Sequence, residues 1–276
     1  MSDDDREVSE LASAFELPDA SRLRALTPAR VALGRTSVSL PTRARLDFDR
    51  CHALARDAVH ARLNSAALAA EIETGIRPGV LRLHSAAANR TEYLQRPDFG
   101  RRLDEASRAL LDKQPRDRAD LALVIADGLS AMAVERHASA LLNELFPRLA
   151  DYRLTPICIV EQGRVAIGDE IGEALNAQIA VVMIGERPGL SSPDSLGVYI
   201  TWEPRPGRTD AERNCISNIR AEGLSYAQAA AQMSAILGEA RRLRLTGVEL
   251  NTSRENGCGE LASPKTIPQG LKPGPF

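Results

Sequence analysis

The stretch QIAVVMIGERPGL, residues 178–190, decides the fold. Its aliphatic run up to Ile184 is continuous rather than alternating, which is typical of a parallel strand buried on both faces of a sheet. The run stops at Gly185, and Glu186 and Arg187 follow at once. Two interpretations are open: an ordinary surface turn, or a corner that presents polar groups to a ligand across the end of the sheet.

Three further apolar runs lie on either side of this one. They are DLALVIADGLS (120–130), LTPICIVE (154–161) and SLGVYITW (195–202). Apolar residues at helical spacing separate or follow them, at 130–149, 165–177 and 225–244. Strands that alternate with helices predict an α/β fold, with an open, mainly parallel Rossmann-like sheet and an N-terminal helical region.

Composition changes along the chain predict four segments. The acidic N-terminus and the Gly- and Pro-rich tail are predicted to be disordered. Between them we expect a helical region and then the α/β domain, which is predicted to contact the ligand. The predicted boundaries are 1–20, 21–115, 116–250 and 251–276.

The totals exclude several classes of protein. Lys plus Arg number 35 against 37 Asp plus Glu, a formal net charge of −2, so neither a nucleic-acid partner nor an anionic membrane is expected. No apolar run approaches the roughly 20 residues needed to span a bilayer, and the acidic start MSDDDREVSE is not a secretory signal. The four cysteines form no C-x-x-C pair, so we predict reduced thiols and no metal site.

Polar residues directly after the predicted strands are the candidate ligand contacts, because ligands of open α/β sheets bind outside the carboxyl ends of the strands. These candidates are Asp127–Gly128, Glu161–Val165 and Glu186–Leu190. Neither G-x-G-x-x-G, G-x-x-x-x-G-K-[ST] nor G-x-S-x-G occurs. No histidine has a metal-type spacing or an obvious carboxylate partner, and His137 is expected to be solvated on a helix. The sequence therefore predicts a crevice without catalytic residues of its own.

Four segments in series resemble the small (light) subunit of ethanolamine ammonia-lyase. They are RPDFGRRL (96–103), ADGLSAMAV (126–134), GRVAIGDEIGEALNAQIAVVMIGERPGL (163–190) and NCISNIR (214–220). The resemblance implies a carbon–nitrogen lyase that is active only as a complex with a large subunit. It also implies that adenosylcobalamin is held between the two subunits, for radical conversion of ethanolamine to acetaldehyde and ammonia.

The resemblance also implies three cofactor contacts, at Val165, Glu186 and Cys215. Taken alone, these residues have ordinary alternatives: a core or strand-edge valine, a solvated turn glutamate and a structural thiol. Arg101 and Arg102 fit either a contact with the partner subunit or a solvated face.

A further expectation concerns the lower axial ligand of the cobalt ion. The motif D-x-H-x-x-G is absent, and we expect no histidine in a strand-end loop, so the hypothesis is that this chain supplies no axial histidine. The expected location is cytoplasmic, either free or inside a bacterial microcompartment. Two alternatives remain: a stand-alone corrinoid- or nucleotide-binding α/β module, and a structural subunit that has lost its cofactor contacts.

Overall fold

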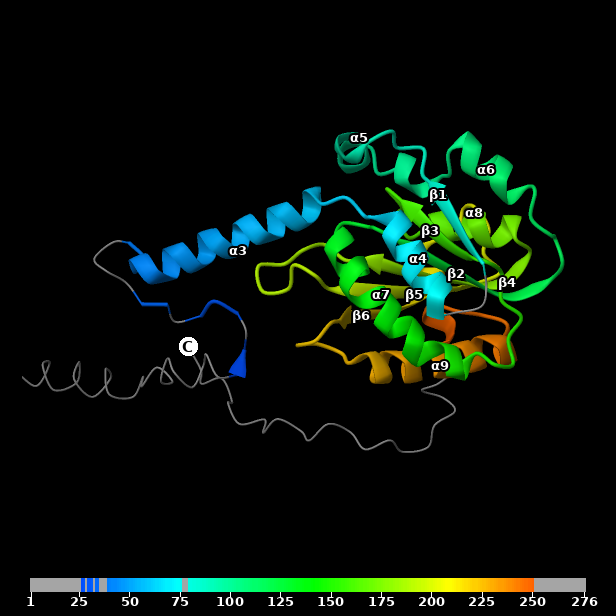
Figure 1. Ribbon diagram of the computed structural model, residues 1–276. Helices are drawn as coiled ribbons and strands as arrows, with labels where there is room; N and C mark the ends of the chain where they lie inside the picture. Colours follow the sequence, from blue (N-terminus) through cyan, green and yellow to red (C-terminus); the bar gives the residue numbers. More distant parts are fainter. Residues whose placement is uncertain (1–25, 28, 32, 35–38, 76–78, 251–276) are drawn as a thin grey trace, which may run out of the picture.

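The computed structural model describes residues 26–27, 29–31, 33–34, 39–75 and 79–250. Within these residues the centre is a six-stranded sheet with the strand order β1-β3-β2-β4-β5-β6 (Figure 1). The strands are β1 (Val80–His84), β2 (Ala119–Ala126), β3 (Ile157–Glu161), β4 (Ala177–Gly185), β5 (Leu196–Trp202) and β6 (Arg213–Ile219).

The direction of the strands divides the sheet into two parts. β1, β3, β2 and β4 run parallel to one another, whereas β5 pairs antiparallel with β4, and β6 pairs antiparallel with β5. The predicted α/β fold is therefore confirmed, and the sheet is mixed, with its parallel part on one side. Every residue of β2 is buried, as its unbroken aliphatic run predicts.

Helices connect the strands, and several of them begin at a side-chain cap that the sequence supplies. Ser130 and Ser225 cap α7 and α9 by accepting hydrogen bonds from backbone N–H groups of the first turn. The helices are α3 (Thr42–His60), α4 (Ser65–Gly75), α5 (Arg90–Gln95), α6 (Glu105–Leu111), α7 (Ala131–Leu145), α8 (Ile167–Ala174) and α9 (Tyr226–Leu243). Short 3₁₀ turns are η1 (Phe99–Arg101), η2 (Phe146–Arg148) and η3 (Asp210–Glu212).

The helices form two layers around the sheet. One core packs residues of α4, α7 and α9 against the sheet, and a second core packs residues of α6 and α8 against its other face (Figure 1). The helix after β2 therefore lies on one face of the sheet, and the helix after β3 on the opposite face. This arrangement sets the position of the candidate site.

Two strands were not predicted. VLRLH, inside the region predicted to be helical (21–115), forms β1 at the edge of the same sheet as β2 to β6. Its burial is partial, with Arg82 exposed and Leu83 buried, so it lacks the continuous apolar run of an inner strand. NCISNI contributes most of β6 at the opposite edge, where exposed and buried residues are interspersed.

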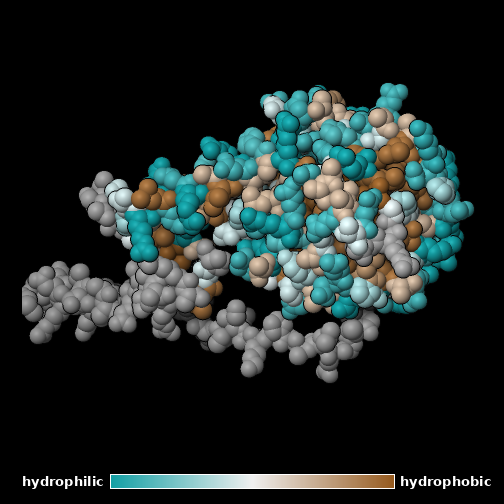
Figure 2. Space-filling model, in the orientation of Figure 1, coloured by the Kyte–Doolittle hydropathy of each residue, from teal (hydrophilic) through white to brown (hydrophobic). Residues whose placement is uncertain are grey.

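Helix α3 extends away from the sheet (Figure 1). Ala55 and Ala58 are its buried residues, whereas Leu46 and Leu54 are 62% and 42% exposed. Hydrophobic side chains are visible along this helix in Figure 2. The helix therefore touches the rest of the protein mainly near its C-terminal end.

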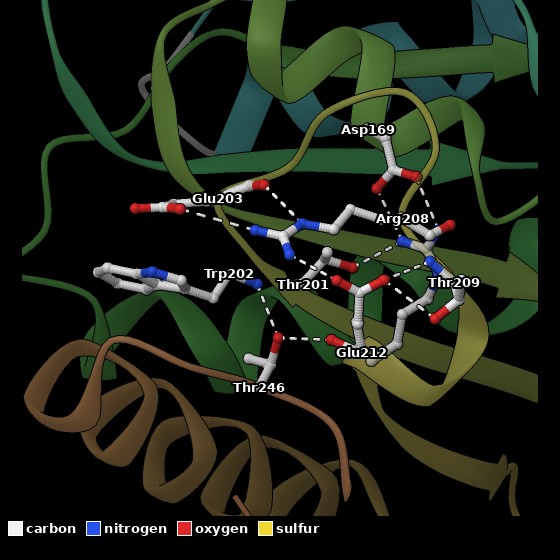
Figure 3. Close-up of polar contacts among 9 residues, drawn as sticks. Asp169, Thr201, Trp202, Glu203, Arg208, Thr209, Glu212 and Thr246 are labelled. Atoms are coloured by element: carbon white, nitrogen blue, oxygen red, sulfur yellow. Dashed lines mark hydrogen bonds and ion pairs between the residues drawn. The ribbon is translucent and has the colours of Figure 1, made fainter. Parts of the chain in front are cut away.

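A polar network with the buried pair Arg213 and Asp169 lies at the amino end of β4, where Trp202 of β5 pairs with Ile179 (Figure 3). Arg213 donates two hydrogen bonds of 2.7 Å to the Asp169 carboxylate, which fastens β6 to α8. The Thr246 hydroxyl accepts from the Trp202 N–H at 2.8 Å and fastens the segment after α9. At this end of the sheet, ion pairs and hydrogen bonds hold the strands to the neighbouring helices and loops.

The predicted disordered segments 1–20 and 251–276, and Cys258 with them, lie outside the described residues. The sequence also predicts a short helix at residues 19–31, and most of these residues lie outside the described ones. Among the helices that are described, none has the length and apolar character to cross a membrane.

Candidate functional site

The candidate site lies where the chain reverses its direction across the sheet. From β2 the chain passes through α7 to β3 on one side, and from β3 it returns through α8 to β4 on the other side of β2. In open α/β sheets such a topological switch point leaves a crevice at the carboxyl ends of the central strands. Here the crevice lies beyond the paired ends of β2 and β4, at Ala126 and Ile184.

A hollow of about 400 Å³ occupies this position. We call it the strand-end hollow. Its lining comes from the loops after β2, β3 and β4, from α5 and from β5: Tyr93, Gly128, Leu129, Arg164, Val165, Ile184, Gly185, Glu186, Arg187 and Tyr199. Two of the three predicted cofactor contacts, Val165 and Glu186, are among these residues.

Two glycines allow the loops after β2 and β4 to touch. Gly128 has a positive φ of 58°, and a Cβ there would overlap the carbonyl oxygen of Gly185. A Cβ on Gly185 would in turn overlap the carbonyl oxygen of Ser130. The N–H of Leu129 donates to the Gly185 carbonyl at 2.9 Å. The floor of the strand-end hollow is therefore backbone packed on backbone.

Glu186 turns its carboxylate toward β5 and β6. Its Oε2 atom accepts hydrogen bonds from the Ser195 hydroxyl and from the Asn218 N–H, the latter at 3.2 Å. Its own N–H donates to the Ser195 carbonyl at 2.9 Å. Within the described residues no hydrogen bond reaches Oε1. One oxygen is thus held by the protein, and the other remains an acceptor on a carboxylate that lines the hollow.

Val165 is half-buried in the segment between β3 and α8. It packs against the core formed by α6 and α8 and also lines the strand-end hollow. It gives the hollow an apolar wall together with Ile184 and Leu129.

Cys215 is exposed on β6 and lies directly opposite Tyr199 of β5. Tyr199 lines the strand-end hollow, whereas Cys215 lies one strand farther out. Partial burial, together with the charge of Glu186, raises the pKa of the Cys215 thiol. Burial also raises the pKa of the Tyr199 hydroxyl well above its usual value. Both groups are therefore neutral near pH 7.

Asp127, predicted from its position after a strand, lies beneath the hollow. It is 1% exposed, and its Oδ1 accepts from the Gly163 N–H at 3.0 Å. Arg90 of α5 lies 3.5 Å from its Oδ2 and also donates to the Gly128 carbonyl at 2.8 Å. Burial raises the pKa of Asp127 to about 6. Asp127 thus holds the loops together and does not face a ligand.

Sequence reasoning missed Tyr93, which comes from α5. Its ring is fully buried, and its hydroxyl donates to the Gly163 carbonyl at 3.1 Å. The guanidinium of Arg164 lies 4.2 Å from the centre of this ring. Arg164 stood within the predicted segment 161–165, but nothing local to α5 indicated that Tyr93 would meet it.

Other predicted positions lie elsewhere. Glu161 is the last residue of β3 and accepts a 2.5 Å hydrogen bond from Ser65. His84 is the last residue of the unpredicted β1 and therefore belongs to the strand rather than to the loop that follows it. The expectation that His137 is solvated is wrong. It is 5% exposed, and its Nδ1 lies 2.8 Å from the Tyr226 hydroxyl.

The described residues contain no group of three or more His, Cys, Asp or Glu side chains arranged to hold a metal ion. The strand-end hollow is lined by one carboxylate, two arginines and two phenols among apolar and glycine residues. This set can accept hydrogen bonds, pair with an anion and exclude water.

Fold and site together define an α/β protein with a hollow at a sheet switch point, the position where open α/β sheets bind ligands. A model of the ethanolamine ammonia-lyase light chain family (EutC) matches residues 18–251. The ethanolamine ammonia-lyase small subunit of Pseudomonas aeruginosa (strain UCBPP-PA14) is 54% identical over 261 residues, 91% of this chain and 95% of its own length. That of Xanthomonas campestris pv. campestris (strain B100) is 57% identical over 235 residues, 83% of this chain and 86% of its own. The chain belongs to the ethanolamine ammonia-lyase light chain family.

Proposed function

We propose that this light subunit holds adenosylcobalamin in the strand-end hollow, against a large subunit, for the deamination of ethanolamine. The observation that carries the proposal is convergence at one site. Val165 and Glu186 are separated along the chain by all of α8 and β4, yet they line the same hollow. Cys215 lies beside the hollow through its pairing with Tyr199.

The size of the hollow supports a shared site. A volume of about 400 Å³ is far smaller than a corrin ring with its nucleotide and adenosyl groups, so this chain would enclose only part of the cofactor. A second polypeptide must then cover the remainder, because a reactive radical needs a water-excluded site. A large subunit is the partner that the family implies.

The chemistry of the hollow also fits the cofactor. The periphery of a corrin carries neutral amide groups that donate hydrogen bonds, and the free Oε1 of Glu186 is an acceptor. Val165, Leu129 and Ile184 provide an apolar wall that excludes water. Backbone contact between the loops of Gly128 and Gly185 fixes the floor. Bound adenosylcobalamin supplies homolysis of its cobalt–carbon bond, and this chain supplies position and shielding.

No catalytic residue is assigned to this chain. Substrate binding and the groups that act on ethanolamine are proposed to belong to the large subunit. We also infer that this chain supplies no axial histidine, and that the complex works in the cytoplasm, free or inside a microcompartment. A Rossmann-like relationship of the sheet is part of the same proposal, supported by the β3-β2-β4 order with helices on opposite faces.

Reconstitution with the large subunit distinguishes the proposed function from the alternative of a stand-alone binding module. The purified chain should be inert toward ethanolamine, and turnover should appear when the large subunit and adenosylcobalamin are added. Tight binding of a corrinoid or nucleotide by the chain alone, without any turnover after mixing, would favour the alternative.

Alkylation of Cys215 tests the site itself. In the two-subunit complex, adenosylcobalamin should slow labelling of Cys215 by iodoacetamide, measured by mass spectrometry. Cys51 on α3 is the internal control, since it lies on another element and should label at the same rate with and without cofactor. If Cys215 were labelled at the same rate with and without adenosylcobalamin, Cys215 would not be a cofactor contact.

A further inference from the structure

Two arginines of the strand-end hollow lack acidic partners. Arg187 is exposed at the rim and makes no hydrogen bond or ion pair with any residue that the structure describes. Arg164 stacks on Tyr93 and donates from Nη2 to the Tyr93 carbonyl at 3.2 Å. The Nε of Arg164 is buried and has no acceptor. A buried guanidinium N–H without a partner is costly, so an acceptor is expected there.

None of the acids near the hollow forms an ion pair with Arg164 or Arg187 among the described residues. Glu186 contributes one negative charge to the lining, and its Oε2 accepts from Ser195 and Asn218. Asp127 lies beneath the floor against Arg90. Asp194, in the loop after Glu186, accepts from Arg136 at 2.7 Å. Arg164 and Arg187 therefore leave the hollow with an excess of positive charge.

The start of α8 adds donors at the same place. Its cap position, Ala166, provides no side-chain hydrogen bond, and within the described residues the N–H groups of Val165 and Ala166 make no hydrogen bond. The two acids in the first turn of α8, Asp169 and Glu170, are paired with Arg213 and Arg108. Free amides at the positive end of a helix favour an anion.

We propose that Arg164, Arg187 and the backbone N–H groups of Val165 and Ala166, directly before α8, form an anion subsite for the phosphodiester of the cofactor's nucleotide loop. The inference rests on the proposed function and deepens it. The phosphodiester is the one anionic group among the neutral amides of cobalamin, so a positive patch selects it. Glu186 and Arg187, adjacent in the chain, then bind groups of opposite character and fix the orientation of the cofactor in the hollow.

Two truncated forms of the cofactor distinguish binding at this subsite from binding at the rest of the site. Adenosylcobinamide lacks the nucleotide loop and its phosphate, whereas adenosylcobinamide phosphate carries a phosphate without the base. Each is titrated into the complex of light and large subunits, and bound corrinoid is measured by its visible absorbance after equilibrium dialysis. The phosphate form should bind roughly 10- to 100-fold more tightly, the range for charge-assisted hydrogen bonds to a phosphate.

Arg187→Gln should reduce that preference to about threefold or less while leaving the affinity for adenosylcobinamide unchanged. Arg164→Lys keeps the charge but removes Nε, and should reduce the preference by a smaller factor. Arg148→Gln is the matched control, an exposed arginine of η2 outside the hollow lining, and should preserve the preference.

If the wild-type complex bound adenosylcobalamin but had equal affinity for the two analogues, the subsite would be overturned and the proposed function would stand. An Arg187→Gln complex that binds both analogues equally less well, or that loses its large subunit in gel filtration, would assign Arg187 to the subunit interface and also overturn it. Failure of adenosylcobalamin itself to bind the wild-type complex would overturn the proposed function and the subsite together.

Discussion

The guanidinium of Arg90 lies 3.5 Å from the carboxylate of Asp127 in the interior beneath the strand-end hollow. Arg90 also donates to the carbonyl of Val59, at the C-terminal end of α3, at 2.7 Å. One buried side chain thus joins the loop after β2 to the helix that extends from the sheet.

Asp127 should make stability depend on pH. Its pKa is raised from 3.8 to about 6 by burial, so the folded chain keeps a proton that the unfolded chain has released between these values. The stabilisation is complete below about pH 4 and is lost as the pH rises through about 6. Relative to Asp127→Asn, wild type should lose up to about 3 kcal/mol of unfolding free energy between pH 4 and 7, at about 1.4 kcal/mol per pKa unit.

Urea unfolding of both proteins across this range measures the difference. Asp117→Asn, at an exposed position, is the control and should track wild type at every pH. A difference between wild type and Asp127→Asn that stays constant with pH would contradict the assignment.

Loss of Asp169 should destabilise the fold strongly. Arg213 is 1% exposed at its side chain, and Asp169→Ala would leave its charge buried without this carboxylate, at a cost of about 3–5 kcal/mol. Asp112→Ala removes an exposed arginine partner, with both side chains more than 60% exposed, and should cost less than about 1 kcal/mol. The midpoints of urea unfolding should therefore separate widely, and similar midpoints would rule out a stabilising role for the buried pair.

Truncation of Glu186 should weaken binding of the cofactor. Glu186→Ala removes the free Oε1 acceptor, so the apparent affinity of the complex for adenosylcobalamin should fall by about 1–3 kcal/mol. Equilibrium titration followed by visible absorbance measures this. Glu73→Ala on α4 provides an exposed control. An unchanged titration with Glu186→Ala would exclude Glu186 as a contact.

The floor of the hollow should not accept a side chain on Gly128. Gly128→Ala combines a positive φ of 58° with overlap of the Gly185 carbonyl, so stability should fall by at least about 1–2 kcal/mol. Gly238→Ala is the matched control, because a Cβ in α9 there meets nothing within 4 Å. It should raise stability by about 0.5–1 kcal/mol. Thermal unfolding of the two variants should shift in opposite directions.

The inner strands could be predicted because their environment is uniform. β2 and β4 are covered by helices on both faces, so nearly every position is apolar and the run is visible without an alignment. Edge strands lack that uniformity. In β1 the exposed Arg82 and half-buried neighbours leave a five-residue segment that short-range patterns do not separate from helix or loop.

The candidate site could be predicted only where a strand-end rule applied. Val165 and Glu186 follow strands, and both line the hollow. Arg90 and Tyr93 come from α5, and long-range packing brings them beneath the loops. The burial of His137 has the same cause, since the hydroxyl that meets its ring belongs to Tyr226, at the start of α9.

The reversal of strand direction at β5 places part of the rim of the hollow on a single loop between β4 and β5. Because β5 pairs antiparallel with β4, residues 186–195 form one short connecting loop whose two ends are held by adjacent strands. The Ser130 hydroxyl donates to the Pro193 carbonyl at 2.9 Å, and Ser195 ties back to Glu186. This ten-residue segment thus carries two of the three charged side chains that line the hollow, Glu186 and Arg187. Under the proposed function, exchanging the segment between relatives would exchange these two cofactor contacts while the sheet beneath keeps its own sequence.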